Sequence, residues 1–418
     1  MAGLGGMASG IAGEMAVRGV GQLIAGRRPE LRDLLLTPRN AARLTDQLAR
    51  MRGAAMKVGQ LISMDAGEMM PSELGRILSR LRADADYMPP RQLKQVLSQA
   101  WGAGWLDRFE RFDVRPIAAA SIGQVHRAQT RDGRDLAIKV QYPGVARSID
   151  SDVQNVGSLI RLSGLLPAGL DLAPLLEEAK AQLHDEADYL REREELLRFA
   201  DLTRGMHGFV LPSPQDDLTT ATVLAMSYQP GDPVESLEDA PERERNDVAA
   251  RLVDLTFREI FDFGHIQSDP NFANYRHDAR TGQIVLLDFG AARAVPPALA
   301  ASYRALFRAG LAGADMTDAA LSLGLFGGET RAEHRKTVCD MLELVFAPLR
   351  AGGMFDFADA SLARHLQQSG MEMAEARDFV HIPPVDTLFV QRKFGGLYLL
   401  CARLRARVDV RALLEQYL

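Results

Sequence analysis

The 418-residue chain has 47% hydrophobic and 25% charged residues, a formal net charge of −6 and two cysteines. These values are typical of a globular protein in a reducing compartment, and they argue against a disulfide scaffold and a cysteine-based zinc site. With this negative net charge, the protein as a whole has no positive potential that would attract nucleic acid. No uninterrupted apolar run reaches the roughly 18 residues of a membrane-spanning helix.

The first predicted segment, residues 1–37, begins with small residues in the stretch MAGLGGMASGIAGEMAVRGVGQLIAGRR. It has no basic region ahead of its apolar part, so it is a poor signal peptide. Glu14 and Arg18 interrupt its apolar character. Two interpretations stay open: a mobile or loosely helical N-terminus, and an interfacial helix that contacts a membrane or a partner.

The next segment, residues 38–111, is predicted to be a helical extension. Three stretches carry apolar residues at helical spacing, and the third, PPRQLKQVLSQAWG, should end at Gly102. Residues 112–141 then alternate apolar and polar positions around the turn RDGR, as a β-hairpin does.

Beyond the hairpin, long helices are expected over residues 147–204, including one continuous helix over 173–203. Two strands are expected within 208–228, and from 241 onward helices dominate around the short strand 283–290. This order predicts an α+β, bilobal, protein-kinase-like fold with the helical extension in front. The kinase-like N-lobe would span 112–230 and the helical C-lobe 231–418. From pattern alone, a generic α+β protein is the alternative.

The strongest candidate site combines HIQSDPNFANY with IVLLDFG. Asp269 precedes Asn274 by five residues, and Asp288 opens an Asp-Phe-Gly after an apolar strand. This is the spacing of a kinase catalytic loop, in which the aspartate accepts or orients a proton and the asparagine binds magnesium. The later aspartate binds the metal that bridges the phosphates. The competing interpretation makes Asp269 a turn cap and Asn274 a turn residue.

Lysine is rare in this chain, since only six of the 49 basic residues are lysine: Lys57, Lys94, Lys139, Lys180, Lys336 and Lys393. A lysine within an apolar segment is therefore informative, because a compact ammonium and a guanidinium are not interchangeable at a phosphate. Lys139 lies in such a segment, LAIKV, after the predicted hairpin turn.

A strand lysine of this kind needs an acidic partner on a helix. The stretch HDEADYLRERE offers several acids, most of which would simply form a solvated helix face. On helical periodicity Asp185, Asp188 and Glu192 share a face, and Glu186 flanks it. One of them should meet Lys139, but spacing does not decide which.

Two further features bear on this site. Where a kinase has a glycine-rich loop over the phosphates, this chain has Ala118, Ala119, Ala120 and Ser121. Upstream, Lys57 and Gln60 lie three residues apart, on one side of a predicted helix among small apolar residues. Composition favours a lysine that snorkels at the edge of a core, and burial would require polar partners.

At these residues the chain resembles the UbiB family of atypical kinases over roughly residues 40–410. The resemblance rests on KVGQ (57–60), AAASIGQVH (118–126), AIKVQYPGV (137–145), EADY (186–189), QSDPNFAN (267–274) and LLDFGAAR (286–293). QSDPN and the ending QRKFGGLYLLCARLRARV look like the mitochondrial-type coenzyme Q kinases.

The resemblance implies a role for each matched residue. Lys139 corresponds to the nucleotide lysine and Glu192 to its paired glutamate. Lys57 and Gln60 correspond to an extension motif that folds across the cleft, and Glu186 and Asp188 to the E-x-D acids that contact this lysine. The resemblance therefore overturns the snorkelling interpretation of Lys57. The alanine loop corresponds to an element linked to altered nucleotide preference and suppressed self-phosphorylation, and alanine does restrict backbone freedom.

The implied activity is ATP- and Mg²⁺-dependent, with ATP or ADP bound, and supports ubiquinone (coenzyme Q) biosynthesis. ATP hydrolysis coupled to remodelling of a lipid precursor or a complex is preferred over two alternatives, a nucleotide-binding scaffold with negligible turnover and a true protein kinase. The implied partners are a lipid or quinone precursor and ubiquinone-biosynthesis enzymes, with no nucleic acid. The implied location is cytoplasmic, with peripheral contact to the inner membrane.

Overall fold

The computed structural model describes residues 51–65, 87–163, 172–269, 271–375, 381 and 383–418. The N-terminal segment and the second predicted helix of the extension therefore lie outside the described residues. By its contacts the chain divides into two compact units, residues 1–190 with 215–226, and residues 191–214 with 227–418. Residues 191–214, expected in the N-lobe, thus group with the second unit. The predicted lobe boundaries themselves stay a prediction.

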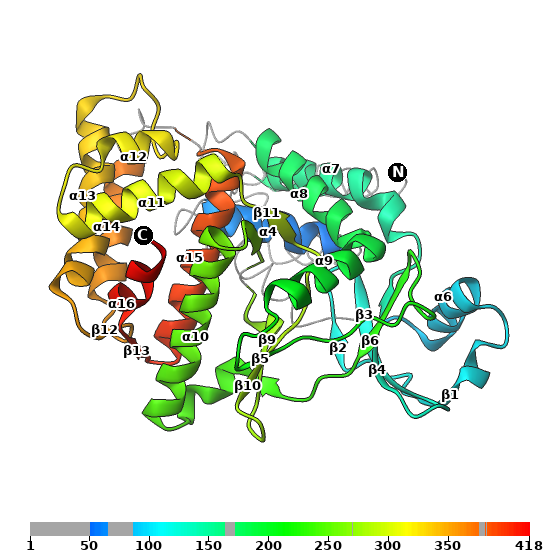
Figure 1. Cartoon of the computed structure of the whole chain (residues 1–418). Coiled ribbons are helices and arrows are strands. Elements are labelled where there is room, and N and C mark those ends of the chain that lie inside the picture. The colour runs from blue at the N-terminus through cyan, green and yellow to red at the C-terminus, as the bar shows by residue number, and fades with distance from the viewer. Residues whose placement is uncertain (1–50, 66–86, 164–171, 270, 376–380, 382) are drawn as a thin grey trace, which may run out of the picture. The chain divides into compact units, whose positions relative to one another are not determined.

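The first unit contains a sheet in the strand order β1-β3-β4-β6, with the short strand β2 added to β3 (Figure 1). The strands are β1 (Phe109–Phe112), β2 (Ala118–Ala119), β3 (Gly123–Thr130), β4 (Asp135–Gln141) and β6 (Val223–Ser227). β3 and β4 form the predicted hairpin, antiparallel from Gly123 opposite Gln141 to Gln129 opposite Asp135. Helix α6 (Pro90–Trp101) contributes to the same hydrophobic core, and it ends at Gly102 as predicted.

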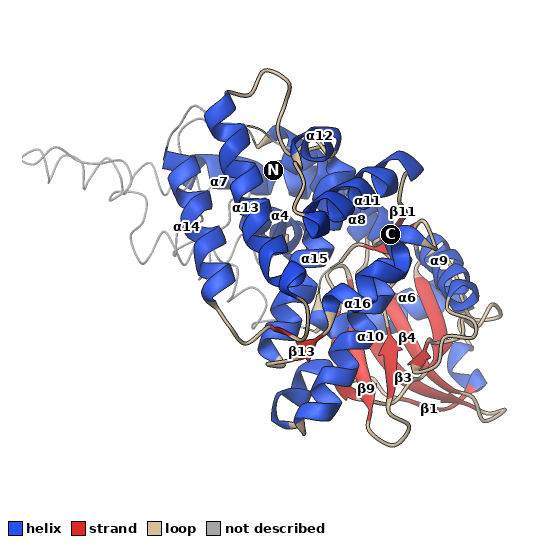
Figure 2. Cartoon of the chain, turned by 60° about the vertical axis from the view of Figure 1, so that its left-hand side comes forward, coloured by secondary structure: helices blue, strands red, loops and turns tan. Residues whose placement is uncertain are grey.

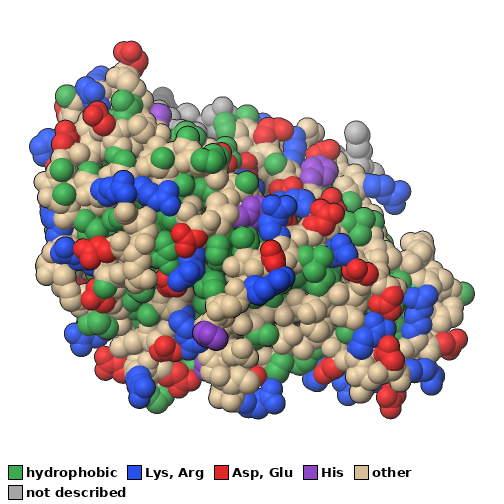
Figure 3. Space-filling view, viewed as in Figure 1, with side chains coloured by type: hydrophobic (Ala, Val, Ile, Leu, Met, Phe, Trp, Pro, Cys, Tyr) green, Lys and Arg blue, Asp and Glu red, His purple; other side chains and the backbone are tan. Residues whose placement is uncertain are grey.

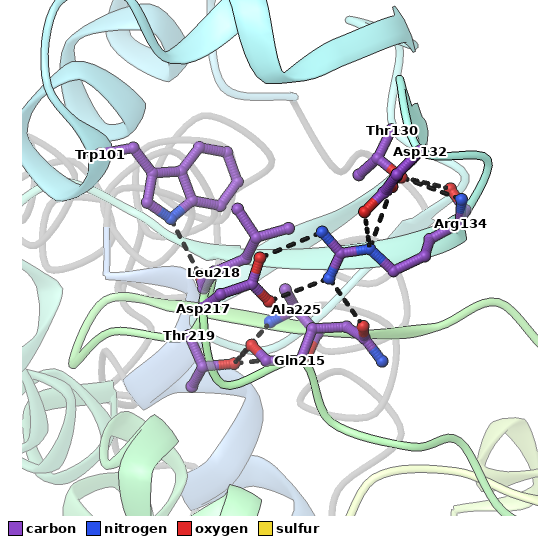
Figure 4. A network of polar contacts seen from close by, with 9 residues as sticks. All are labelled: Trp101, Thr130, Asp132, Arg134, Gln215, Asp217, Leu218, Thr219 and Ala225. Carbon is purple, nitrogen blue, oxygen red and sulfur yellow. Dashed lines mark hydrogen bonds and ion pairs between the residues drawn. The ribbon is translucent and has the colours of Figure 1, made fainter.

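The tip of this hairpin explains why residues 215–226 belong to the first unit (Figure 4). The guanidinium of Arg134 donates to both carboxylate oxygens of Asp217, at 2.9 and 3.0 Å, and to Gln215 at 3.0 Å. The indole of Trp101 donates to the carbonyl of Leu218 at 2.8 Å. A side chain from the hairpin and another from α6 therefore hold the turn that leads into β6.

Three helices form the second core of this unit: α4 (Arg52–Asp65), α7 (Val145–Ser163) and α8 (Ala173–Ala187). Ala55, Val58 and Leu61 of α4 are buried there with Val153 and Leu183. The apolar face predicted for the extension thus packs inside the unit, and its hydrophobic burial holds α4 in place.

The prediction of one continuous helix over 173–203 was wrong. Helix α8 ends at Ala187, Asp188 has a non-helical ψ of 86°, and α9 (Tyr189–Leu202) begins afresh. The carbonyl of Ala187 accepts a hydrogen bond from the side chain of Gln141, at 2.6 Å. A strand residue therefore occupies an acceptor that a continuous helix would use for its own backbone.

The second unit is mostly helical, as predicted (Figures 1 and 2). Besides α9, its helices are α10 (Glu242–Phe261), α11 (Pro297–Ala312), α12 (Thr317–Ser322), α13 (Ala332–Ala351), α14 (Ser361–Glu375), α15 (Val385–Arg403) and α16 (Val410–Leu414). Helices α10 and α15 pack against each other. Phenylalanine rings from α10, α11 and α15 meet at centroid distances near 6 Å: Phe257, Phe261, Phe307 and Phe394.

Small sheets complete the second unit. One has the order β5-β10-β9-β7, and two further pairs are formed by β8 with β11 and by β12 with β13. Their bounds are β5 (Phe209–Val210), β7 (Asp232–Pro233), β8 (His265–Gln267), β9 (Tyr275–Asp278), β10 (Gln283–Leu286), β11 (Ala292–Ala294), β12 (Phe355–Asp356) and β13 (Arg407–Val408). The two strands expected within 208–228 both form, but β5 pairs with β10 and β6 joins the sheet of the first unit.

The surface agrees with the modest net charge. On the face shown in Figure 3, acidic and basic side chains lie interspersed over helices and strands alike. Among the described residues, no helix combines the length and the apolar character needed to cross a membrane.

Candidate active site

The alanine loop is a short strand followed by a tight turn. Ala118 pairs with Val125 and Ala119 with Gln124, and the backbone N–H of Ala120 donates to the carbonyl of Gly123 at 2.9 Å. Side chains of Ala118 and Ala119 are exposed. The backbone of the predicted nucleotide loop is thus already engaged with β3.

Gly123 closes this turn against two neighbours. A Cβ at Gly123 would lie 2.4 Å from the carbonyl oxygen of Val140 and 2.8 Å from the hydroxyl of Tyr189. Any larger residue would therefore push the turn away from β4. Lys139, opposite Val125 in the hairpin, is buried, and its ammonium lies 5.2 Å from the centre of the Tyr189 ring. The turn and the predicted nucleotide lysine are thus built on the same two strands.

The extension reaches this turn through one carboxylate. The ammonium of Lys57, on α4, donates to one oxygen of Glu186 at 2.5 Å, and the hydroxyl of Ser121 donates to the other oxygen. Side-chain exposure is 6% for Lys57 and 14% for Glu186. Lys57 is therefore buried and ion-paired with the first E-x-D acid, and the regulatory role implied for this pair stays a prediction.

The backbone of α4 also meets the turn. A Cβ on Gly53 would lie 2.9 Å from the carbonyl oxygen of Ser121 and 3.3 Å from a methyl carbon of Ile122. Glycine therefore allows the first turn of α4 to approach Ser121. Asp188, the second E-x-D acid, is exposed at the C-terminal cap of α8. Gln60 lies on α4, and its side chain is outside the described part of the structure.

In the second unit, Asp269 and Asn274 face each other across the predicted catalytic loop. The side-chain amide of Asn274 donates to Asp269 at 3.2 Å, and the other oxygen of Asp269 accepts from the backbone N–H of Asn271, also at 3.2 Å. A short 3-10 turn, Phe272–Asn274, presents Asn274, which is buried. Because Asn274 donates through its nitrogen, its amide oxygen is left as the atom that a metal would take.

Asp288 has a left-handed backbone, with φ of 58°. Non-glycine residues adopt this conformation rarely, and such strain is concentrated at functional sites. One carboxylate oxygen of Asp288 accepts a hydrogen bond from the backbone N–H of Gly290 at 3.1 Å. The backbone carbonyl of Asp288 accepts a second one from the side-chain amide of Gln267, also at 3.1 Å. The turn is therefore fixed on both sides by the residues around it.

Asp288 and Asn274 fit the ligand chemistry of Mg²⁺, which takes one or two carboxylates, other oxygens and the phosphates of its substrate. Within the described ranges, no three His, Cys, Asp or Glu side chains are grouped to hold a metal.

Helix α9 holds the Asp-Phe-Gly segment from within the same unit. Arg191 donates to the carbonyls of Gly290 and Ala292, at 2.7 and 2.5 Å. The ring of Phe199 lies 4.8 Å from Phe289 and 5.7 Å from His265, between centroids. These contacts were not predicted from the sequence, because they depend on where α9 starts after the break at Asp188.

The predicted pairing of Lys139 with Glu192 stays a prediction. Lys139 belongs to the first unit and Glu192 to the second, and both are buried. Further contacts were missed from the sequence: in the first unit the hydroxyl of Ser121 as a partner of Glu186, and in the second unit those of Arg191 and Lys393. For Lys393 the scarcity of lysine was a usable indication, because it lies in the apolar stretch LFVQRKFGGLYLL.

Comparison with known proteins shows the family of the chain. Residues 80–320 match the model of the ABC1 atypical kinase-like domain. The chain belongs to the ABC1 (UbiB) family of atypical kinases. It is 34% identical to atypical kinase COQ8, mitochondrial, of Saccharomyces cerevisiae, over 99% of this chain and 83% of that protein. It is 36% identical to atypical kinase COQ8B, mitochondrial, of Rattus norvegicus, over 91% and 72%.

The fold has a solved counterpart. A Mycobacterium tuberculosis protein determined as a complex with erythromycin superposes with a TM-score of 0.62, at 24% identity over 91% of this chain and 96% of that chain. The predicted α+β kinase-like fold and the resemblance to the UbiB family are thus confirmed. As a member of the ABC1 family, the protein is a kinase-type enzyme.

Proposed function

We propose that this ABC1 kinase is an ATP- and Mg²⁺-dependent enzyme that hydrolyses ATP in support of ubiquinone biosynthesis, at a peripheral site on a membrane. The observation that carries the proposal is the pairing of Asp269 with Asn274 beside the left-handed Asp288, in a chain of this family. Asp269 supplies a proton acceptor, and Asn274 and Asp288 supply oxygen ligands for a metal. Phosphoryl transfer requires these groups from the protein.

Each residue has a defined task in this proposal. Asp288 and the amide oxygen of Asn274 would hold Mg²⁺, which would supply positive charge to offset that of the phosphates. Asp269 orients the attacking hydroxyl or water and accepts its proton, and the hydrogen bond from Asn274 keeps that carboxylate turned toward the loop. Lys139 contacts the phosphates from β4, with Glu192 as its partner. Ala118–Ser121 cover the nucleotide.

The test is hydrolysis by the purified full chain, with Asp288→Asn as the deciding variant. The variant loses the carboxylate that anchors the metal, so it should lose the Mg²⁺-dependent part of the rise in melting temperature given by ATP. It should also lose phosphate release, measured with and without liposomes and a phenolic mimic of a quinone precursor. Asp318→Asn, an exposed acid in α12, is the matched control. An undiminished Mg-ATP shift in Asp288→Asn would remove Asp288 from the metal site.

Two alternatives are separated by the same assays. A nucleotide-binding scaffold would give the thermal shift of the wild type without phosphate release in any condition. A protein kinase would incorporate labelled phosphate into protein. The contact of Lys57 and Glu186 favours ATP hydrolysis over protein phosphorylation, because it ties the extension to the turn that would cover the nucleotide.

The alanine loop provides a sharper test of that preference. Ala119 is paired in β2, and glycine there would add backbone freedom to the turn. Ala119→Gly should therefore change the preference between ATP and ADP or permit self-phosphorylation. If Ala119→Gly keeps the wild-type preference between ATP and ADP and incorporates no labelled phosphate, the alanines have a packing role and do not tune the nucleotide site.

A further inference from the structure

Lys393 is buried in the middle of α15, and its ammonium has three polar neighbours. It lies 2.8 Å from a carboxylate oxygen of Glu259 on α10, and it donates to the carbonyl of Gln267 and to the hydroxyl of Tyr275, each at 3.0 Å. Side-chain exposure is 4% for Lys393 and 2% for Glu259. Since an ammonium has three N–H groups, one neighbour is available for each.

Two of these neighbours bracket the predicted catalytic loop. Gln267 is the last residue of β8, and Tyr275 is the first residue of β9. The seven residues between them contain Asp269 and Asn274. A single charged group therefore fixes where the loop leaves one strand and where it enters the next.

The same contact extends to the metal-binding turn. The backbone of Gln267 accepts from Lys393, and its side chain donates to the carbonyl of Asp288 at 3.1 Å. Gln267 is also paired with Ala292 in the ladder of β8 and β11. A shift of the Gln267 backbone would thus be transmitted to both Asp269 and Asp288.

The electrostatics support an ionised Lys393. Burial alone lowers the pKa of Lys393, but the carboxylate of Glu259 and the Tyr275 hydroxyl more than compensate, so this pKa is raised. Burial also raises the pKa of Glu259, against the effect of Lys393, and the 2.8 Å approach of the two groups favours the ionised pair. Packing does not require this charged pair, because well-packed apolar residues commonly stabilise a core as well or better. Apolar residues could not donate to Gln267 and Tyr275, however.

We propose that Lys393 is a positioning residue for catalysis, which acts from the C-terminal helix α15 by holding both ends of the loop that carries Asp269 and Asn274. The proposal rests on the proposed function for its kinetic consequence, but its structural consequence can be measured without turnover. Small misplacements of reacting groups can reduce rates up to about a hundredfold, so the effect should appear in kcat rather than in KM.

The deciding variant is Tyr275→Phe, which removes one hydroxyl and leaves the pair of Lys393 and Glu259 intact. We expect kcat for Mg-ATP hydrolysis to fall about tenfold with KM unchanged, since the loop loses one of its two anchors. Backbone amides of residues 268–274 should exchange hydrogen faster by mass spectrometry. Tyr398→Phe, on the same helix and away from Lys393, is the control and should match the wild type.

A second variant removes the charges together. Glu259→Gln with Lys393→Met leaves no unpaired charge in the core, so the fold should survive while both anchors are lost. We expect a larger loss of kcat and still faster exchange in the loop. If this double variant unfolds, Tyr275→Phe decides alone.

The outcomes separate the two proposals. A wild type without hydrolysis would contradict the proposed function, and the exchange of residues 268–274 would still decide the role of Lys393. Wild-type exchange in the loop of Tyr275→Phe overturns the positioning role. Wild-type kcat in Tyr275→Phe, from an enzyme that does hydrolyse ATP, overturns it as well. A lowered melting temperature with unchanged kcat per folded molecule would make Lys393 purely structural.

Discussion

Replacing Glu186 by glutamine should release the extension from the alanine turn. The glutamate accepts from Lys57 through one oxygen and from Ser121 through the other. A glutamine keeps the shape but replaces one acceptor oxygen with an NH₂ group, which would face a donor. Lys57, with a side chain 6% exposed, would then lose its ion pair with Glu186.

The size of the effect follows from this burial. Removing one partner of a buried ion pair costs about 3–5 kcal/mol, and 14% exposure of Glu186 places this pair at the lower end. With about 3 kcal/mol lost, the equilibrium for release of α4 should shift roughly a hundredfold toward the open form, since 1.4 kcal/mol is tenfold. The amides of residues 52–65 should exchange hydrogen correspondingly faster.

The chain offers a matched control on the same helix. Glu177 pairs with Lys180 at 2.6 Å, one turn apart on α8, but its side chain is 72% exposed. Exposed pairs contribute about 0–1 kcal/mol, so Glu177→Gln should leave exchange in α4 unchanged. If Glu186→Gln and Glu177→Gln behave alike, burial of the Lys57 pair does not restrain the extension, and the reasoning fails.

Two other perturbations test the packing around the site. Gly53→Ala should lower stability and loosen α4, because its new Cβ would lie 2.9 Å from the carbonyl oxygen of Ser121. Gly370→Ala is the control, since a Cβ there meets no atom within 4 Å, and it should raise the stability of α14 by about 0.5–1 kcal/mol. A higher melting temperature for both variants would contradict the close approach of Gly53 to Ser121. Burial raises the pKa of the Glu195 carboxyl, but the hydrogen bond with His265 and the nearby charges of His265, Arg198 and Arg191 together lower it by more, so the pKa lies below the usual value. A carboxylate with a lowered folded pKa stabilises the protein above its unfolded pKa, and this contribution is lost as the pH falls through the folded value. Glu195→Gln should therefore lose stability at pH 7 and show a weaker decline in melting temperature below about pH 4.5, and an acid limb identical to the wild type would refute the assignment.

Local patterns were enough to predict the hairpin of β3 and β4, the end of α6 at Gly102 and the strand before Asp288. Each depends on residues close together in the sequence, where turn chemistry and periodicity act directly. The spacing of Asp269 and Asn274 likewise predicted their shared loop, because five residues can close only a short turn.

The break at Asp188 could not be predicted in this way. The segment 173–203 has no proline or glycine apart from Pro174 at its start, so its periodicity continues unbroken. The competing bond comes from Gln141, 46 positions earlier than Ala187. Helical periodicity therefore gave a common face to Asp185, Asp188 and Glu192, although Asp188 and Glu192 follow the end of α8. The contact of Lys57 with Glu186, one of the two E-x-D acids that the resemblance implied for it, comes from the packing of α4 against α8.

The lysines show how amino-acid composition alone can indicate a site. Three of the six are buried, Lys57, Lys139 and Lys393, while Lys94 and Lys336 are exposed. At Lys393 the acceptors come from a helix, a strand end and a tyrosine, so they converge on one nitrogen from different directions. A planar guanidinium directs its donors outward in a fork and cannot replace that geometry. In a chain that otherwise uses arginine, the lysine at position 393 therefore marks a place where three oxygens meet a single compact charge.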